Sequence, residues 1–551
     1  MKVCDYIAKR CAELNKHTFL FVGGGNMYLA NALGKNGVDY KCMHHEQALS
    51  MAAEAYARVT GKPSVCIVTT GPGSTNVITG LYGAWVDSIP MLFISGQVRT
   101  EVMRRGKIRQ IGDQEVNIID VVKPLTKFAG ICKEPKEIGQ LMNKALYEAS
   151  TKRQGPTWLD IPLDVQNAPY EEIENAPMSS IGQYRPASNP NINPFIEACT
   201  LVENAFKTFT LLKQAKRPII IAGSGIRSAQ AIETFWKVMS KLHIPAIPSF
   251  NARDLGPFHY PAFGMLGCEF CNNIIDKSDL ILILGCRMNI RQIGWEFGKM
   301  GHNATKIMVD IDPEELNKHT FKPDIKIEAD VGDFLAILDS FLTKEYTNQW
   351  AGDIRKESIM PNSNYVSPVG LAKALNKFTE MEEIVVFANG LYPPIVSQEL
   401  EIKKDMRLIL NSGCGAMGYG LPAAIGAAFA SGRRIICLEG DGSIQLNIQE
   451  LQTLVHHNLP IKVFIGNNGG YNSIKNTQDR YFDGFYVGAD AQSGISFPNF
   501  GRLAKAYEIK YVRIRRDADL EGVIKRVLQV EGPIICELNL DPKFMLEKAK
   551  I

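Results

Sequence analysis

The chain has 551 residues, of which 45% are hydrophobic and 22% charged, with a net charge of +3 and an isoelectric point near 8.1. This length exceeds what one hydrophobic core normally supports, so several domains are expected. The near-neutral charge gives no indication of nucleic-acid binding, and no apolar run is long enough to span a membrane. A small-molecule substrate is therefore expected.

The N-terminal segment and the cysteines indicate a protein of a reducing cytosol. Charged residues in the first part of the chain include Lys9, Arg10, Glu13 and Lys16. Met1 to Leu20 is therefore not a signal peptide. The 12 cysteines show no disulfide-like framework. Cys268 and Cys271 have the spacing of half a zinc or redox motif, but no second pair follows and His259 stands alone, so buried or incidental thiols are favoured.

Two segments interrupt the alternation of apolar runs and amphipathic stretches. Residues Glu171 to Pro194 are rich in Pro, Asn and Ser, and residues Thr343 to Pro368 are polar; both are typical of interdomain linkers. They divide the chain into three blocks, residues 1–170, 190–343 and 366–545. Because strand-like runs alternate with amphipathic helices in each block, we predict three α/β domains built on doubly wound parallel sheets.

In the first block, Val38 to Met43 is predicted to be a strand, followed by a helix that ends at Gly61. The helical stripe consists of Ala48, Met51, Ala52, Ala55, Tyr56 and Val59. Glu46 lies at the junction between the strand and the helix. An isolated glutamate at this place is commonly a charge that complements the helix dipole.

In the middle block, three predicted strands each lead into a turn with glycine or aspartate. The strands are Pro218 to Ala222, Leu280 to Leu284 and Lys306 to Val309. The turns are Gly223-Ser224-Gly225, Gly285-Cys286-Arg287 and Asp310-Ile311-Asp312-Pro313. The first turn lacks a third glycine at Ser228, so it is a weak dinucleotide fingerprint.

In the third block, two apolar runs and the segment between them predict a βαβ unit. Ile435 to Leu438 and Ile461 to Ile465 are the expected strands. Helical spacing is shown by Ile448, Leu451, Leu454 and Val455. A right-handed crossover makes the strands parallel, so Asp441 and Asn468 emerge at the same edge of the sheet, where open α/β sheets bind ligands.

Together, Gly440-Asp441-Gly442 and Asn467-Asn468 have the layout of a magnesium–diphosphate site. Mg²⁺ prefers hard oxygens, which the Asp441 carboxylate, the Asn468 amide and the Gly470 carbonyl would supply beside diphosphate and water. Gly440 and Gly442 would let backbone N–H groups approach phosphate. Either motif alone is commonly a turn or loop. Their 27-residue spacing from Asp441 to Asn468 favours the binding site.

These motifs resemble those of thiamine-diphosphate-dependent enzymes of the acetolactate (acetohydroxyacid) synthase-like family, over nearly the whole chain. In the first block the resemblance rests on His45-Glu46-Gln47, Ala52 to Arg58, Thr60 to Pro63, Gly71-Pro72-Gly73 and Ser95 to Val98. In the third block it rests on Ser412 to Ala424 and on the two motifs of the proposed magnesium site. It implies that the blocks are pyrimidine-binding, central and diphosphate-binding domains.

The resemblance implies that Glu46 hydrogen-bonds a ring nitrogen of the cofactor's aminopyrimidine. A carboxylate suits this role because it can share a proton with a ring nitrogen in a dry site. Met417 would support the bent cofactor, while the Gly415 carbonyl would accept from the pyrimidine amino group. Met417 could instead be a core residue.

Further cofactor contacts follow from the same resemblance. The expected thiamine diphosphate contacts are Gly440, Gly442, Ser443, Asn389 and Gly390, of which the last two depart from the synthase pattern. FAD, which has no net redox role in the synthases, is expected at Gly223, Gly225, Arg287 and Asp310. Sister enzymes keep this domain without flavin. The alternative for these four residues of the central domain is therefore a role in packing.

The resemblance is weakest at the pocket for the second substrate. Gln97, Gln114 and Lys127 match residues that line the synthase pocket. Asp113, however, stands where an aromatic residue is expected and Thr477 where a tryptophan is expected. That tryptophan helps synthases to prefer 2-ketobutyrate, so the more polar walls leave the acceptor open.

A basic loop and a possible lid lie near this pocket in the sequence. The segment between Gln97 and Gln114 is longer than in the synthases and carries Arg99, Arg104, Arg105, Lys107 and Arg109. Such a run is commonly a solvated face, yet arginines bind phosphate well. A related branch with a pattern similar to Gly470 to Gln478 is associated with surface-sugar pathways. Arg480 to Asp490 is either a mobile lid or a surface loop.

The sequence thus predicts a cytoplasmic carboligase, a transferase or lyase that needs thiamine diphosphate, Mg²⁺ and FAD. It would decarboxylate a 2-keto acid, pyruvate first, and transfer the acyl carbanion to an acceptor carbonyl. The alternatives are acetyl transfer to a nucleotide-linked keto-sugar, simple decarboxylation and non-catalytic cofactor binding. Because the family's cofactor bridges two subunits, a homodimer or homotetramer is expected, without nucleic-acid or membrane partners.

Overall fold

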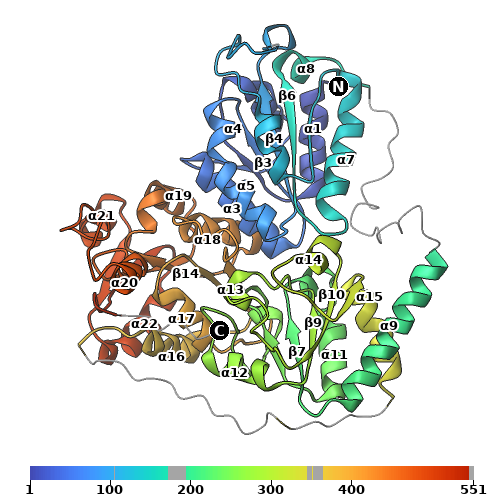
Figure 1. Ribbon diagram of the computed structural model, residues 1–551. Helices are drawn as coiled ribbons and strands as arrows, with labels where there is room; N and C mark the ends of the chain where they lie inside the picture. Colours follow the sequence, from blue (N-terminus) through green and yellow to red (C-terminus); the bar gives the residue numbers. More distant parts are fainter. Residues whose placement is uncertain (105, 172–193, 344–349, 351–363, 545–551) are drawn as a thin grey trace.

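A computed structural model of the protein describes residues 1–104, 106–171, 194–343, 350 and 364–544. The predicted linkers fall largely outside these residues, and Arg105 of the basic loop is also outside them. The described residues form three α/β domains, each built on one sheet of parallel strands with helices on both faces (Figure 1). The predicted fold class is therefore confirmed.

The first domain contains a six-stranded sheet in the order β2-β1-β3-β4-β6-β5. Its strands are β1 Thr18–Leu20, β2 Tyr40–Lys41, β3 Ser64–Val68, β4 Met91–Gln97, β5 Phe128–Ile131 and β6 Pro156–Pro162. Its helices are α1 Val3–Leu14, α2 Met27–Lys35, α3 Glu46–Thr60, α4 Pro72–Asn76, α5 Ile78–Val86, α6 Ile118–Val122, α7 Ile138–Ser150 and α8 Leu163–Asn167.

The start of α3 agrees with the sequence, whereas the strand before it is shorter than predicted. His45 caps the helix, because its Nδ1 accepts a hydrogen bond from the backbone N–H of Gln47 at 3.0 Å. Gly61 ends it in the left-handed conformation, with φ of 68°. Only Tyr40–Lys41 of the predicted strand pairs, with β1 alone, because β2 is an edge strand with Tyr40 exposed.

The central domain has a five-stranded sheet in the order β11-β10-β9-β7-β8. Its strands are β7 Pro218–Ala222, β8 Ala246–Pro248, β9 Leu280–Leu284, β10 Thr305–Asp310 and β11 Ile325–Glu328. Its helices are α9 Pro194–Gln214, α10 Gly225–Ser228, α11 Ile232–Leu242, η6 Phe250–Leu255, α12 Glu269–Lys277, α13 Ile290–Ile293, α14 Pro313–Asn317 and α15 Val331–Phe341. The three predicted strands of this block are confirmed.

The third domain has a six-stranded sheet in the order β13-β12-β14-β15-β17-β16. Its strands are β12 Ile384–Phe387, β13 Arg407–Leu410, β14 Ile435–Gly440, β15 Ile461–Asn467, β16 Lys510–Ile514 and β17 Ile534–Asn539. Its helices are α16 Pro368–Phe378, α17 Tyr392–Glu399, α18 Gly420–Ser431, η7 Ile444–Glu450, α19 Leu451–His456, α20 Asn472–Tyr481, α21 Phe500–Ala506 and α22 Leu520–Gln529.

The predicted βαβ unit is present, but its connection is not one regular α-helix. Strands β14 and β15 are parallel, with Gly440 opposite Gly466. Between them a 3₁₀ segment, η7, precedes the short helix α19, because Asn447 leaves helical geometry with φ of −137° and ψ of 32°. The side-chain amide of Asn447 donates instead to the Gly418 carbonyl at 2.8 Å.

One hydrophobic core spans the first and third domains, where α3 packs on α18 (Figure 1). The helices approach so closely that a Cβ on Gly426 would lie 1.9 Å from the carbonyl oxygen of Ala52. The buried hydroxyl of Tyr419 donates to Glu54 at 2.6 Å across the same interface. These contacts fix how the edges of the two sheets are oriented.

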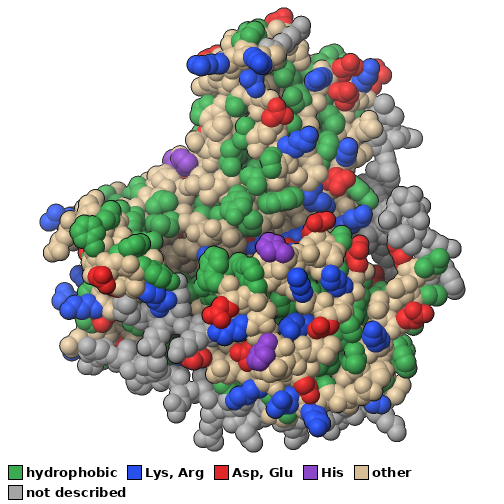
Figure 2. Space-filling model, in the orientation of Figure 1, with side chains coloured by type: hydrophobic (Ala, Val, Ile, Leu, Met, Phe, Trp, Pro, Cys, Tyr) green, Lys and Arg blue, Asp and Glu red, His purple; other side chains and the backbone are tan. Residues whose placement is uncertain are grey.

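The face of the molecule seen in Figure 2 has no dominant charge. Figure 2 shows positive and negative side chains interspersed over this face, in keeping with the net charge of +3. Among the helices that the structure describes, none is long and apolar enough to cross a membrane.

Candidate functional site

The carboxylate of Asp441 organises the loop at the ends of β14 and β15. Its Oδ2 accepts backbone N–H bonds from Asn468 at 3.0 Å, Gly469 at 2.8 Å and Gly470 at 3.3 Å. Its Oδ1 accepts from Gly442 at 2.8 Å. The predicted meeting of Asp441 and Asn468 at one sheet edge therefore occurs.

The same loop contains the oxygens that a hard cation requires. Among the described residues, the buried Asn468 Oδ1 has no hydrogen-bond partner. Burial raises the pKa of Asp441 to about 6, although its N–H partners act in the opposite direction. In the part of the chain that the structure describes, no group of three or more His, Cys, Asp and Glu side chains could hold a metal. A cation here would use one carboxylate, the Asn468 amide oxygen and the Gly470 carbonyl, which suits Mg²⁺.

The glycine after Asp441 is required by close packing. A Cβ on Gly442 would lie 2.1 Å from the ring of Tyr471, so no side chain fits there. Gly440 has more room, since its nearest neighbour, the Asn389 carbonyl oxygen, would be 3.6 Å away. Ser443, next in the chain, accepts a hydrogen bond from the Gly418 backbone N–H at 3.0 Å.

That bond joins the Asp441 loop to a second loop, Asn411 to Gly418, which connects β13 to α18. Gly415 adopts a left-handed conformation, with φ of 66°. The side-chain amide of Asn389 donates to the Ala416 carbonyl at 2.6 Å. Met417 is half-buried and faces a cavity.

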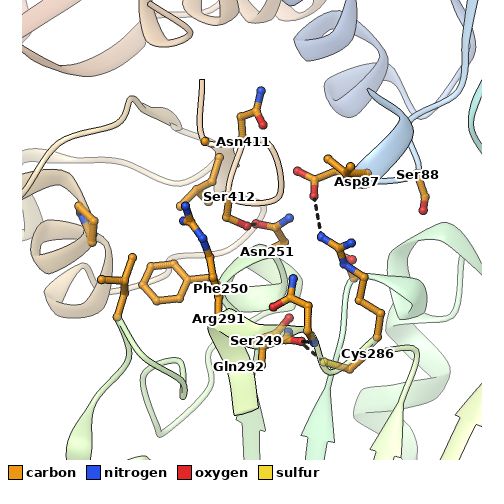
Figure 3. A pocket seen from close by; sticks show the side chains of 18 of the residues that line it. Asp87, Ser88, Ser249, Phe250, Asn251, Cys286, Arg291, Gln292, Asn411 and Ser412 are labelled. Atoms are coloured by element: carbon orange, nitrogen blue, oxygen red, sulfur yellow. Dashed lines mark hydrogen bonds and ion pairs between the residues drawn. The ribbon is translucent and has the colours of Figure 1, made fainter. Parts of the chain in front are cut away.

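This cavity, of about 610 Å³, lies where the three domains meet (Figure 3). The sequence-predicted residues that line it are Gly225, Arg287, Asp310, Asn389, Gly390, Gly415, Met417, Thr477 and Arg480. Gly223 does not line it but packs on Gly285, whose carbonyl oxygen would be 2.0 Å from a Cβ on Gly223. A second, smaller cavity is lined by Asn468, and Leu391 lines both.

Glu46 lies at the carboxyl edge of the first sheet. It is 9% exposed, and its Oε2 accepts a hydrogen bond from the side-chain amide of Asn76 at 3.0 Å. A Cβ on Gly73 would lie 3.8 Å from its Oε1, so the loop Gly71 to Gly73 packs beside it. Asn76 was not identified from the sequence. The one signal for it in the sequence is its position just after this glycine motif.

Gln97 and Gln114 lie at the same edge. Thr70 Oγ1 donates to Gln97 Oε1 at 3.0 Å and to the backbone carbonyl of Gln114 at 3.4 Å. The amide nitrogen of Gln97 donates to the carboxylate of Asp160 at 2.9 Å. Burial raises the pKa of Asp160, which the sequence did not single out, to about 6.

Lys127 is held within its own domain. Its ammonium group donates to the backbone carbonyls of Glu148 and Thr151, the latter at 2.7 Å. These carbonyls end α7, so the side chain caps that helix. Burial lowers the pKa of Lys127 to about 8.

Within one chain, only part of the expected site lines the large cavity. Gly415 and Met417 line it, whereas the other predicted residues of the site do not, namely Glu46, Gln97, Gln114, Lys127, Asp441 and Asn468. The first domain contributes Val86 to Ser88 and Lys152 to Gln154 to the cavity. These segments precede β4 and β6, so they lie at the opposite, amino edge of the first sheet.

Comparisons with known proteins agree with this arrangement. Thiamine pyrophosphate enzyme families match all three domains: the N-terminal TPP binding domain at residues 1–116, the central domain at 207–338 and the C-terminal TPP binding domain at 388–538. The acetolactate synthase large subunit of Cyanidium caldarium is 30% identical over 95% of this chain and 90% of its own length. The isozyme 3 large subunit of Escherichia coli K12 is 31% identical over 93% and 90%.

The chain belongs to the acetolactate synthase-like group of thiamine pyrophosphate enzymes. The resemblance drawn from the motifs is thereby confirmed, and so is a thiamine-diphosphate-dependent carboligase acting on carbon–carbon bonds. Thiamine diphosphate is its cofactor. The residues present fit that group, because Asn468 Oδ1, which is buried and has no partner among the described residues, follows the strand beside that of Asp441.

In this acetolactate synthase-like enzyme, α20 forms a polar wall of the large cavity. Thr477 and Arg480 line it, and so does Asn476, whose amide nitrogen is buried without a hydrogen-bond partner. Beyond the helix, Phe482 and Phe485 are 61% and 75% exposed. The segment predicted as either a lid or a surface loop thus begins at the cavity and continues on the surface.

The basic loop after β4 has a defined conformation. The carboxylate of Glu115 accepts backbone N–H bonds from Arg104, from Ile111 at 2.9 Å and from Gly112 at 3.2 Å. These bonds hold the pKa of Glu115 below its ordinary value, although burial opposes them. In the described part of this loop, Lys107, Arg109 and Arg99 are exposed, Arg99 to 64%, whereas Arg104 is half-buried.

Proposed function

We propose that this enzyme decarboxylates pyruvate and transfers the resulting acyl carbanion to an acceptor carbonyl. The observation that carries the proposal is the convergence of Asp441 and Asn468, with the Asn468 side-chain oxygen buried and unpartnered beside the Asp441 carboxylate. Two strand ends that are 27 residues apart in sequence thereby supply ligands for one cation.

The residues of the third domain would bind and orient the cofactor. Asp441, Asn468 and the Gly470 carbonyl would hold Mg²⁺ against the diphosphate, while backbone N–H groups beside Gly440 and Gly442 would contact phosphate. When bound, thiamine diphosphate would supply a carbon acid whose deprotonated form adds to a keto carbonyl, and a thiazolium ring that takes up the electron pair left when carbon dioxide departs. Met417 would support the bent cofactor, and the cavity beside it would limit access of water.

Glu46 would share a proton with the cofactor's pyrimidine ring. It is buried, and Asn76 is its one side-chain partner among the described residues, which leaves one carboxylate oxygen available. Because the family's cofactor bridges two subunits, we propose that each site combines Glu46, Gln97 and Gln114 of one chain with Asp441 of a second. A homodimer is then the smallest active unit, with a homotetramer as its doubled form.

FAD is the proposed ligand of the central part of the large cavity. Gly225, Arg287 and Asp310 lie there at the ends of strands β7, β9 and β10, the edge at which open α/β sheets bind nucleotides. An arginine and closely packed glycine backbones suit a diphosphate. Purified protein that has no yellow colour, and gains none with FAD, would contradict this assignment.

A nucleotide-linked keto-sugar is the alternative acceptor, and the polar wall formed by α20 favours it. Thr477, Asn476 and Arg480 offer hydroxyl, amide and guanidinium groups to the cavity. Such groups match an acceptor with many hydroxyl and phosphate groups better than a small keto acid whose polar groups are one carbonyl and one carboxylate. The basic loop after β4 would add positive charge at the edge that holds Glu46.

Product analysis tests the proposal. The protein is incubated with thiamine diphosphate, Mg²⁺, FAD and pyruvate, with and without keto-sugar nucleotides, and the products are identified by mass. We expect release of carbon dioxide and a product that carries a new two-carbon acyl unit. Acetaldehyde as sole product would indicate simple decarboxylation, and no release of carbon dioxide from any 2-keto acid would indicate a non-catalytic protein.

A further inference from the structure

The loop Asn411 to Gly418 is held by side chains from the other two domains as well as its own. Ser412 Oγ donates to Oδ1 of Asn251 in the central domain at 2.7 Å. Figure 3 shows the two side chains directed toward each other at the cavity, with Arg291 beside them. Asn251 belongs to η6, the segment of the central domain that lies against β13.

At two glycines of the loop, charged groups of the other domains lie where a side chain would be. A Cβ on Gly413 would lie 2.3 Å from Oδ1 of Asp87 and 2.9 Å from Nη2 of Arg287. A Cβ on Gly415 would lie 3.0 Å from Nη2 of Arg291. Asp87, Arg287 and Arg291 thus both line the three-domain cavity and contact the loop, so they help to determine its shape.

A buried chain of charges then returns to the same loop. Asp87, 3.8 Å from Arg287, also pairs with Arg58 at 2.8 Å. Arg58 pairs with Glu54, which accepts from the hydroxyl of Tyr419. Tyr419 directly follows Gly418, so the first domain contacts the loop near both of its ends.

We propose that Asn251 and Asp87 are positioning residues of the thiamine site. Neither belongs to the domain that binds the diphosphate. They hold the loop of Gly415 and Met417 in the conformation that receives the cofactor, Asn251 through Ser412 and Asp87 through Gly413 and Arg287. This inference rests on the proposed function of that loop.

The test measures binding of thiamine diphosphate with Mg²⁺ by calorimetry in four proteins: the unaltered chain, Asn251→Ala, Ser412→Ala and the double variant. Loss of one hydrogen bond that orders the loop is expected to weaken binding by about 5- to 10-fold in each single variant. The two side chains form one hydrogen bond, so the second substitution should add little. The affinity of the double variant should lie within about twofold of the affinity of the weaker-binding single variant.

A matched control separates positioning from general domain stability. Gln398 also joins the central and third domains, through the Ala262 N–H at 2.9 Å and the Leu266 carbonyl at 3.3 Å, but it does not contact the loop. Gln398→Ala should leave the affinity for thiamine diphosphate within about twofold of the unaltered chain. Asn251 is only half-buried, so Asn251→Ala is expected to fold, with a similar thermal midpoint.

The outcomes are distinguishable. An unchanged affinity in Asn251→Ala, or effects of the two single substitutions that multiply in the double variant, would overturn the inference and leave the proposed function intact. Failure of the unaltered chain to bind thiamine diphosphate would overturn both. Asp87→Asn, which removes the charge beside Gly413, provides a second variant with the same expected loss of affinity.

Discussion

The backbone N–H of Asn468 donates to the carboxylate of Asp441 at 3.0 Å, while the buried side-chain oxygen of Asn468 has no partner in the part of the chain that the structure describes. The first contact fixes the geometry of the loop. The second leaves one oxygen unsatisfied, which in a folded protein is costly unless a donor or a cation occupies the space beside it. This pair is the clearest structural sign of the proposed metal site.

Substitution of Asn468 by alanine should weaken Mg²⁺-dependent binding of thiamine diphosphate by at least about 10- to 100-fold. That is the usual loss of metal affinity when a residue that only supports a metal ligand is removed. Asn539→Ala is the matched control, because Asn539 ends the neighbouring strand β17 and its side chain bonds to Arg513 at 3.1 Å and to the Arg515 carbonyl at 3.3 Å. Calorimetry with and without EDTA measures both. Equal losses in the two variants, or binding that survives chelation, would count against a cation at Asn468.

Glu46→Gln should lower turnover by about 10²- to 10⁴-fold, the usual contribution of one acid–base group. Affinity for thiamine diphosphate should change little, since the diphosphate and the metal site lie in another domain. Steady-state carbon dioxide release and calorimetry on the same preparation separate the two quantities. Turnover at the level of the unaltered chain would remove Glu46 from the mechanism.

Thr477→Trp should narrow the large cavity and lower the use of a keto-sugar nucleotide as acceptor at least about 10-fold, while pyruvate is still consumed. Thr477→Val serves as the control, because it removes the hydroxyl at nearly constant volume. Competition between pyruvate and a keto-sugar nucleotide as acceptors, with products counted by mass, gives the ratio of the two products. If both substitutions change the ratio equally, polarity rather than space determines the preference.

The stability of the protein should depend on pH through Asp160. Burial raises its folded pKa to about 6, above the unfolded value. Between about pH 4 and 6 the folded state keeps a proton that the unfolded state has lost, so this group's contribution falls as pH rises, by up to about 3 kcal/mol. Asp160→Asn removes this titration. The thermal midpoint of the unaltered chain, relative to that of the variant, should therefore decline across this window; a constant difference would contradict the assignment.

Much of the fold follows from local sequence patterns. The predicted strands Pro218 to Ala222 and Leu280 to Leu284 coincide with β7 and β9, because buried parallel strands form continuous apolar runs. The short length of the edge strand β2 and the 3₁₀ segment η7 did not follow from such patterns. Each is determined by tertiary contacts, in the second case by the hydrogen bond between Asn447 and Gly418.

The site was predictable to a similar degree. Asp441 and Asn468 could be placed together because parallel strand ends share an edge. Asn76, Asp160 and Asn251 could not, since each meets its partner through folding of distant segments and carries no motif of its own. The placement of Glu46 away from the Met417 cavity depends on how whole domains pack.

The central claim is that one site is built from two chains, and subunit mixing tests it most directly. Glu46→Gln and Asp441→Asn proteins, each nearly inactive, are mixed under conditions that exchange subunits, with distinct tags to confirm the exchange. A mixed dimer would contain one site with both native residues, so activity should rise toward about a quarter of the unaltered level. Confirmed mixed dimers with no activity above that of the parents would contradict the account.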